Sequence, residues 1–326
     1  MPVGRLVNAP VIPPDMAAEL AKFDSSAERM IESFVKKLEA QPPPPMIYHY
    51  TNDVGLRGIL ESGKIWLSDI FSLNDPSELS HGFSHAIDIM KRRAADGPLE
   101  TKTFSQIVEA FSAQGGIRSV AHYFVCSFSS DGNDLGQWRA YGDNGRGYSI
   151  GFDTKAFEDG FVQESSPGRW NNSTFWVTYK DAQLIELHTR IVDSMFHLIS
   201  LPRGRDLESA VMHAYMDNLE VSFLLHAVRA VLFFKHEAYA NEREYRFLQV
   251  HRAGNVPPPE VKYRSRPYGL IRYREFDWRS RSEAAIKSIM IGPAAEKANA
   301  SVFAKDCLTA FHPLPVEITE SKIPYR

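Results

Sequence analysis

The sequence has few of the features that mark secreted proteins, proteins stabilised by a structural metal, or membrane-spanning proteins. It has two cysteines in 326 residues, Cys126 and Cys307, and they lie far apart in the chain. Two such cysteines make neither a disulfide framework nor a set of zinc ligands, so we expect a reducing compartment. The longest apolar runs, such as residues 230–234, are far too short to cross a bilayer.

A strong charge imbalance and a targeting segment are also missing. The net charge is −3, which argues against a protein that coats nucleic acid non-specifically or binds a membrane surface. The first residues lack the apolar run of a signal peptide. We therefore expect a cytoplasmic protein with no membrane partner. With 44% hydrophobic and 24% charged residues, the chain has the composition of a globular protein with a sizeable core.

Four consecutive prolines, Pro42–Pro45, predict an extended spacer near the N-terminus. Before them, Ser25 and Glu28 fit a capping box, and apolar residues then recur at helical spacing. We therefore predict a helical N-terminal extension over residues 1–45, with the proline-rich spacer at its end. Residues 46–326 are predicted to form the main domain.

Three predicted strands carry polar side chains at or near one end. Residues 47–51 alternate like a strand and include His49, although a lone strand histidine is most often simply half-buried. The strand predicted over residues 122–129 ends in Ser-Phe-Ser. A third strand, residues 242–250, places Glu242, Glu244 and Arg246 on one face. Two carboxylates on one face of a strand can simply face solvent. The apolar residues that follow indicate an interior strand, however, where burial of two carboxylates costs free energy unless they are paired or functional.

The remaining pattern predicts a mixture of helices and strands. Gly145, Gly147 and Gly151 do not make a dinucleotide fingerprint, because the spacing is wrong and a strand follows. No metal-binding spacing occurs among the histidines of the long helices, so no metal is expected. The other predictions are a helix at 54–62 capped by Gly63, a strand at 65–68, a helix opened by Asp75 with Pro76 and Glu78, two strands within 161–180, helices at 181–201, 207–233 and 294–310, and strands at 148–152, 286–291 and 315–319.

A basic segment, residues 260–282, interleaves seven lysines and arginines with four tyrosines and tryptophans. Such a pattern is a weak signal for nucleic-acid binding and is more often a solvated loop and edge strand.

These segments together resemble the bacterial domain-of-unknown-function family numbered 2971, over roughly residues 46–326. The family is similar, much more remotely, to ADP-ribosyltransferases. The resemblance implies an α+β fold with a split, mostly antiparallel sheet, flanking helices and a cleft for NAD. The segments that carry it are Tyr48–Thr51, Leu56 with Gly58–Leu60, Asn74–Pro76 with Glu78, Ser127–Ser129, Trp138 with Tyr141, Glu242 with Glu244–Arg246, and Ile291–Pro293.

The resemblance also implies roles for individual residues. Cleavage of the nicotinamide–ribose bond builds positive charge on the sugar, and a carboxylate near the ribose hydroxyl stabilises it. Glu244 is the candidate for this role, and Glu242 would orient or deprotonate the acceptor. Ser127 and Ser129 would fix the glutamate. The implied NAD-binding residues are His49, which is also a catalytic candidate, Tyr50, which replaces a common glycine, Thr51, Ser127 and Ser129. From residue chemistry alone, Trp138 or Tyr141 could stack on nicotinamide, and Arg139 or Arg146 could meet the pyrophosphate.

The sequence is compatible with three functions. The first is an NAD-consuming ADP-ribosyltransferase or NAD glycohydrolase, for which the resemblance implies a toxin or phage-defence context. Its acceptor could be a protein, a nucleic acid or water. The second is a nucleic-acid-binding or processing protein that uses residues 260–282. The third is a non-catalytic domain that senses a nucleotide.

Overall fold

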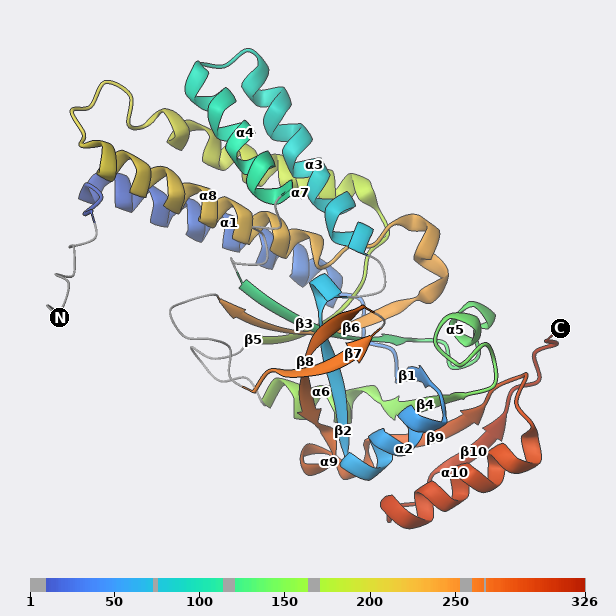
Figure 1. Ribbon diagram of the computed structural model, residues 1–326. Helices are drawn as coiled ribbons and strands as arrows, with labels where there is room; N and C mark the ends of the chain where they lie inside the picture. The colour runs from blue at the N-terminus through green and yellow to red at the C-terminus, as the bar shows by residue number, and fades with distance from the viewer. Residues whose placement is uncertain are drawn as a thin grey trace, which may run out of the picture. The chain divides into compact units, whose positions relative to one another are not determined.

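The structure is a computed structural model, and its chain falls into two compact units (Figure 1). A helical unit contains residues 1–36, 77–120 and 180–234, and a sheet unit contains residues 37–76, 121–179 and 235–326. The expected division into 1–45 and 46–326 differs from this grouping, because α1 packs with helices from later in the chain. The residues that the structure describes are 10–72, 76–113, 121–163, 171–252, 260–266 and 268–325.

The helical unit is built around two long helices that lie side by side (Figure 1). The Asp24 carboxylate on α1 accepts a hydrogen bond from His226 of α8 at 2.9 Å. Near the end of α1, the Phe34 ring stacks on Phe234 with 5.0 Å between centroids. The elements of this unit are α1 (Pro14–Glu39), α3 (Pro76–Ala95), α4 (Leu99–Ala113), α7 (Asp181–Met195), the 3-10 helix η3 (Phe196–Ser200) and α8 (Ser209–Val231).

The first helix is longer than the sequence predicted. The prediction began it at Ser25, but α1 begins at Pro14, and Ser25 lies within it. Met16, Leu20 and Phe23 are buried and extend the same apolar stripe towards the N-terminus. Residue Pro76 begins α3 as predicted, while the predicted caps lie outside the described residues (Asp75) or among side chains that are not described (Glu78).

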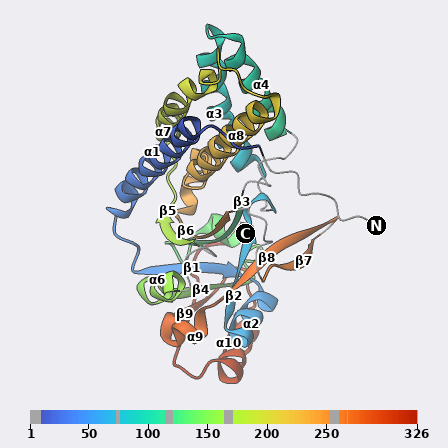
Figure 2. The same ribbon diagram turned by 90° about the vertical axis from the view of Figure 1, so that its left-hand side faces the viewer.

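The sheet unit has a ten-stranded, open and mostly antiparallel sheet with flanking helices, so its class is mixed α and β. The strand order is β10-β9-β4-β1-β3-β2-β8-β7, β6 pairs with β3 and β5, and only the pairing of β10 with β9 is parallel among the described strands. Figure 2 shows the β7–β8 hairpin at one edge. The strands are β1 (Met46–Thr51), β2 (Lys64–Asp69), β3 (Ala121–Ser129), β4 (Tyr148–Asp153), β5 (Asn171–Trp176), β6 (Glu244–Arg252), β7 (Lys262–Arg266), β8 (Gly269–Asp277), β9 (Ile286–Ile291) and β10 (Glu317–Glu320).

Four helices cover one face of this sheet and form its core. Phe128 of β3 contacts Phe152, Phe157 and Phe247 edge to face, with centroids 5.1–5.9 Å apart. The covering helices are α2 (Asp53–Ser62), α6 (Thr154–Gln163), α9 (Trp278–Arg281) and α10 (Lys297–Phe311). The other short helices of the unit are η1 (Ile70–Ser72), α5 (Leu135–Ala140), η4 (Glu237–Glu242) and η5 (Glu283–Ala285).

Local signals placed α2 correctly, whereas the region after β4 was predicted wrongly. Gly63 ends α2 in the left-handed region, at φ 67°, and its N–H bonds to the Ile59 carbonyl, as the cap prediction required. Residues 161–180 were predicted as two strands, but residues 161–163 are the end of α6, and β5 is the one strand among the described residues of this stretch. Phe157 and Phe161 lie one turn apart on α6 and bury the same helical face.

The proline segment is docked on the sheet unit. The indole N–H of Trp176 donates to the carbonyl of Pro42 at 3.0 Å, and the Thr154 N–H donates to the Pro45 carbonyl at 3.2 Å. Pro44 is buried between these contacts. The segment is therefore a fixed spacer, held at both ends.

Candidate functional site

A buried carboxylate, Glu244, begins β6 and is held by three side chains. Its exposure is 3%. The Ser127 hydroxyl donates to Oε1 at 2.5 Å and the Arg246 guanidinium donates to the same oxygen at 2.7 Å. The Lys235 ammonium donates to Oε2 at 3.3 Å. These contacts fix the carboxylate in one orientation and place two cations beside it.

The pairing of β3 with β6 explains why Ser127 reaches Glu244. Ser129 lies opposite Glu244 and Ser127 opposite Arg246 in the antiparallel register. Side chains of directly opposite and diagonal pairs share one face of a sheet, so Ser127 and Glu244 are diagonal neighbours. The sequence prediction that a serine of the Ser-Phe-Ser strand and a glutamate of the Glu-x-Glu segment lie together is thus realised by Ser127 and Glu244.

The charge state of Glu244 follows from its surroundings. Burial alone would raise its pKa, but the charges of Arg246 and Lys235, with hydrogen bonds from Arg246 and Ser127, lower the pKa to about 2. Glu244 is therefore ionised throughout the neutral pH range. An ionised, desolvated carboxylate with fixed orientation can stabilise positive charge that develops next to it.

Glu242 does not lie on the strand, contrary to the prediction. It ends η4, and Arg243 takes a left-handed backbone conformation at φ 45° before β6 begins at Glu244. The two glutamates nevertheless meet at Lys235, whose ammonium lies 2.5 Å from Glu242 Oε2. The Ser129 hydroxyl donates to the backbone carbonyl of Glu242 at 2.9 Å. Ser129 thus fixes the backbone before Glu244, whereas Ser127 contacts the carboxylate itself.

Sequence reasoning missed two members of this cluster, Lys235 and Tyr179. The Tyr179 hydroxyl accepts a hydrogen bond from the backbone N–H of Glu244 at 3.0 Å. Burial raises the pKa of Tyr179 to about 12, so the hydroxyl stays protonated. Lys235 is 9% exposed at its side chain. The sequence shows that Lys235 precedes Glu242 and Glu244, but only the fold shows that its side chain contacts both of them.

His49 meets the same strand from another side. Its ring donates to the backbone carbonyl of Ser127, and it packs against Phe128 with 5.7 Å between ring centroids. Because Ser127 and Phe128 project from opposite faces of β3, the His49 ring and the Glu244 carboxylate approach β3 from its two sides. The residue as a whole is half-buried, and burial lowers the pKa of His49 to about 4, so the imidazole is neutral at pH 7.

The sheet is split beside Ser127. β3 pairs with β6 along its whole length. On its other edge β3 pairs with β2 at Phe124 and Val125 and with β1 at Ser129. Within the described strands, residues 126–128 make no ladder pairs on that edge, and His49 takes up the free Ser127 carbonyl there. The Ser127 side chain is exposed at this point, next to the buried Glu244.

Tyr50 and Trp138 belong to a buried network on the loop after β3. The Tyr50 hydroxyl donates to the Asp131 carbonyl at 2.7 Å and accepts from the Asp134 N–H at 2.9 Å. Trp138 has no exposed surface, packs edge to face on Tyr50 at 4.8 Å, and donates from its indole to Asn133 at 3.0 Å. This network gives both rings a structural role; their predicted contact with NAD stays a prediction.

The other predicted NAD contacts have their interactions elsewhere among the described residues. Thr51 ends β1 and lies close to Gly55 at the start of α2. Tyr141 is 42% exposed, and the Arg139 guanidinium lies 5.7 Å from the Tyr325 ring. Arg146 forms a 3.1 Å ion pair with Asp143.

The basic segment forms the β7–β8 hairpin, and acidic partners neutralise much of it. Glu275 accepts from Lys262 at 2.8 Å, and Asp69 accepts from Arg272 at 2.6 Å. Arg264, in contrast, stands over the ring of Trp66 with 5.6 Å to the centroid. The residues 260–282 thus include a short helix and a two-stranded edge.

Comparisons with known proteins give one match, to a family model over part of the chain. Among the described helices, none has the length and apolar character needed to cross a membrane. No curated protein and no solved structure matches the chain. Residues 137–247, which include β4, β5 and both glutamates, match the model of a family described as a protein of unknown function, DUF2971.

Proposed function

We propose that the chain consumes NAD by breaking its nicotinamide–ribose bond, as an ADP-ribosyltransferase or an NAD glycohydrolase. The observation that carries this proposal is the ionised Glu244, fixed by the Ser127 hydroxyl at the split of the sheet. Loss of nicotinamide leaves an oxocarbenium-like ribose, and a preorganised carboxylate is the group that such a cation requires. The remote resemblance to ADP-ribosyltransferases supports the same assignment.

The two oxygens of Glu244 suit different tasks in this scheme. Oε1 accepts two short hydrogen bonds, from Ser127 and Arg246, and these anchor the carboxylate. Among the described residues, Oε2 accepts only the longer hydrogen bond from Lys235, at 3.3 Å. Oε2 is therefore the oxygen that would accept a hydrogen bond from a ribose hydroxyl, entering where the Ser127 side chain is exposed.

The same contacts suggest roles for the residues around Glu244. Glu242 keeps 18% of its side chain exposed and shares Lys235 with Glu244, so it is placed to orient the acceptor. His49 would act as a positioning residue, because its ring holds the backbone of Ser127. The acceptor can be a protein, a nucleic acid or water; release of nicotinamide without an added acceptor would identify water.

Nicotinamide release from NAD by the purified chain tests the proposal directly. We expect release by the wild type and a loss of about two to three orders of magnitude in Glu244→Gln. Glu275→Gln is the matched control, because Glu275 is also a strand carboxylate paired with two lysines. A folded wild-type chain that releases no nicotinamide, with or without a cell extract as acceptor source, would contradict the proposal.

A second candidate function, nucleic-acid binding, is favoured by one surface of the β7–β8 hairpin. Trp66 is 45% exposed and Tyr263 is 61% exposed, beside Arg264. Aromatic faces next to an arginine can stack on bases. Titration with single-stranded RNA and DNA at rising salt would show a steep loss of affinity if this surface binds phosphates. Binding that is absent at low salt would exclude this function.

A further inference from the structure

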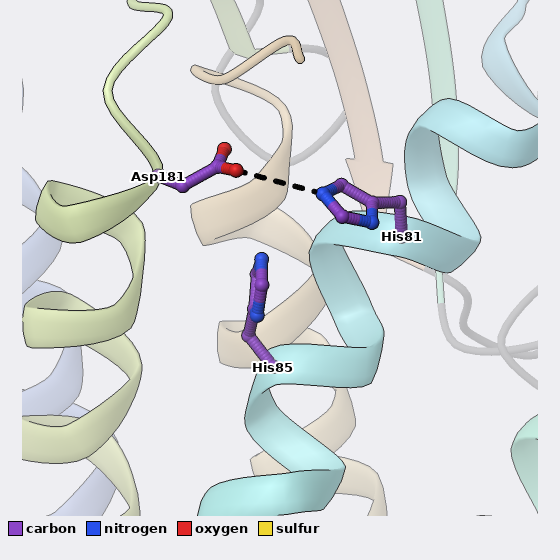
Figure 3. Close-up of side chains that lie close together, drawn as sticks. All are labelled: His81, His85 and Asp181. Carbon is purple, nitrogen blue, oxygen red and sulfur yellow. Dashed lines mark ion pairs between the residues drawn. The ribbon is translucent and has the colours of Figure 1, made fainter. Parts of the chain in front are cut away.

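Two histidines and an aspartate of the helical unit converge on one space between α3 and α7. His81 and His85 are one turn apart on α3, and Asp181 begins α7. Figure 3 shows all three side chains pointing towards that space. One ligand atom from each lies within 4.8 Å of the others. Residues four apart share one helix face, so α3 presents both imidazoles together.

The spacing of these atoms is that of groups placed around an ion. The His81 Nε2 and Asp181 Oδ2 atoms are 3.6 Å apart, which is beyond ordinary hydrogen-bond distance. Ligand atoms around a tetrahedral zinc ion lie roughly 3.3 Å from one another, given bond lengths of about 2.0–2.1 Å. A small movement of side chains that are 44% and 37% exposed would bring this pair to that separation.

His85 gives a second, independent observation. Its Nε2 atom is buried and forms no hydrogen bond to any described residue. A buried ring nitrogen without a partner is uncommon in folded proteins and costs free energy. In Figure 3 the His85 ring stands below the line between His81 and Asp181 and is directed towards it. A cation at that point would supply the missing partner.

We propose that His81, His85 and Asp181 bind a divalent transition-metal cation and thereby join α3 to α7. Imidazole nitrogens favour zinc, copper, iron or nickel over magnesium or calcium, which prefer oxygen ligands alone. Three protein ligands leave at least one coordination position open, as in sites where the metal also holds water or a substrate. The exposure of His81 and Asp181 gives the cation a route from solution. The proposal does not depend on NAD consumption.

Sequence reasoning missed this site for a definite reason. The four-residue spacing of the two histidines is visible in the sequence, but the third ligand lies far along the chain on another helix. The expectation of no metal rested on the histidines of the long helices after residue 181, and His81 and His85 precede them.

The test uses the full-length chain, stripped with a chelator, dialysed and titrated with Zn²⁺ by calorimetry. We expect one Zn²⁺ per chain and a higher thermal midpoint in its presence, because a ligand that binds only the folded state stabilises it. His81→Ala and Asp181→Asn should each weaken binding by more than the 10–100-fold that loss of an outer-shell partner typically costs. His197→Ala is the control, since His197 is an exposed histidine of the same unit.

Spectroscopy with Co²⁺ in place of Zn²⁺ adds a readout of the ligands themselves. The visible absorption of protein-bound Co²⁺ should appear with the wild type and with His197→Ala, and should be lost with Asp181→Asn. Because His81 and Asp181 are both partly exposed, these variants should fold even if a change at His85 disrupts packing. A wild-type chain that takes up no Zn²⁺, or an Asp181→Asn variant that binds it as tightly as the wild type, overturns the proposal.

Discussion

Replacement of Glu244 by glutamine removes one negative charge from a site whose contacts are otherwise kept. Gln has the same shape and retains one carbonyl oxygen to accept from Ser127 or Arg246. The variant also removes a negative charge from beside two buried cations, Arg246 at 1% exposure and Lys235 at 9%, of which Lys235 keeps its ion pair with Glu242. We therefore expect Glu244→Gln to lose stability as well as the NAD-cleaving activity.

The size of the stability loss follows from the pKa of Glu244. The ordinary value is 4.5 and the folded value is about 2. At about 1.4 kcal/mol for each pKa unit, this difference corresponds to about 3 kcal/mol in favour of the folded state at neutral pH. Removal of one partner from a buried ion pair costs a similar amount, about 3–5 kcal/mol. Since the folded pKa is depressed, this contribution is complete above pH 4.5 and disappears as the pH falls towards 2.

Two measurements on the purified variants separate the catalytic role from the structural one. Urea unfolding at pH 7 should show the loss of about 3 kcal/mol in Glu244→Gln, and a much smaller loss at pH 2–3. Nicotinamide release, measured where both proteins are folded, should fall by two to three orders of magnitude. Glu244→Gln with full activity would refute the assignment of Glu244 and shift it to Glu242. Equal stability of variant and wild type at pH 7 would refute the electrostatic reasoning.

Three further predictions concern His49, Tyr179 and α1. His49→Gln should make folding less sensitive to acid between pH 6.5 and 4, because the wild-type ring is held neutral in the folded state and protonates in the unfolded one; equal pH profiles by thermal melting would contradict this. Tyr179→Phe should cost about 1–3 kcal/mol of unfolding free energy in urea titrations, since the Glu244 N–H loses its acceptor, and an unchanged midpoint would contradict that contact. Deletion of residues 1–40 should lower the thermal midpoint by exposing the apolar side of α8 while leaving nicotinamide release unchanged, whereas deletion of residues 1–9, which keeps α1 whole, should do neither; a truncated chain as stable as the full one would show that α1 is dispensable.

Local sequence signals, such as a capping glycine or a run of apolar residues, were enough to place some helices and strands. Gly63 has to leave the right-handed region, and it marks the end of α2 from the sequence alone. The strand at 286–291 was placed correctly as β9, and its isoleucines Ile286, Ile289 and Ile291 are buried in the core. A mostly antiparallel sheet with flanking helices was also expected and confirmed.

Tertiary contacts decided what the sequence could not. The strand predicted from Glu242 starts at Glu244, because Arg243 adopts a left-handed conformation that no local pattern announced. Lys235 joins the Glu244 cluster through a turn of the chain, and Tyr179 joins it through the neighbouring segment. The pairing of Ser127 with Glu244 was predicted from a resemblance, since residues on separate strands carry no sequence signal of their distance.

The strand β7 ends the sheet and leaves one row of backbone groups without a neighbouring strand in the described order. All five of its residues are exposed, and three of them, Lys262, Arg264 and Arg266, are cationic. An open strand edge can pair with the same edge of another molecule and start aggregation, and positive charges on that edge oppose such pairing. The basic character of this hairpin therefore protects the solubility of the folded chain, whether or not it also binds a nucleic acid.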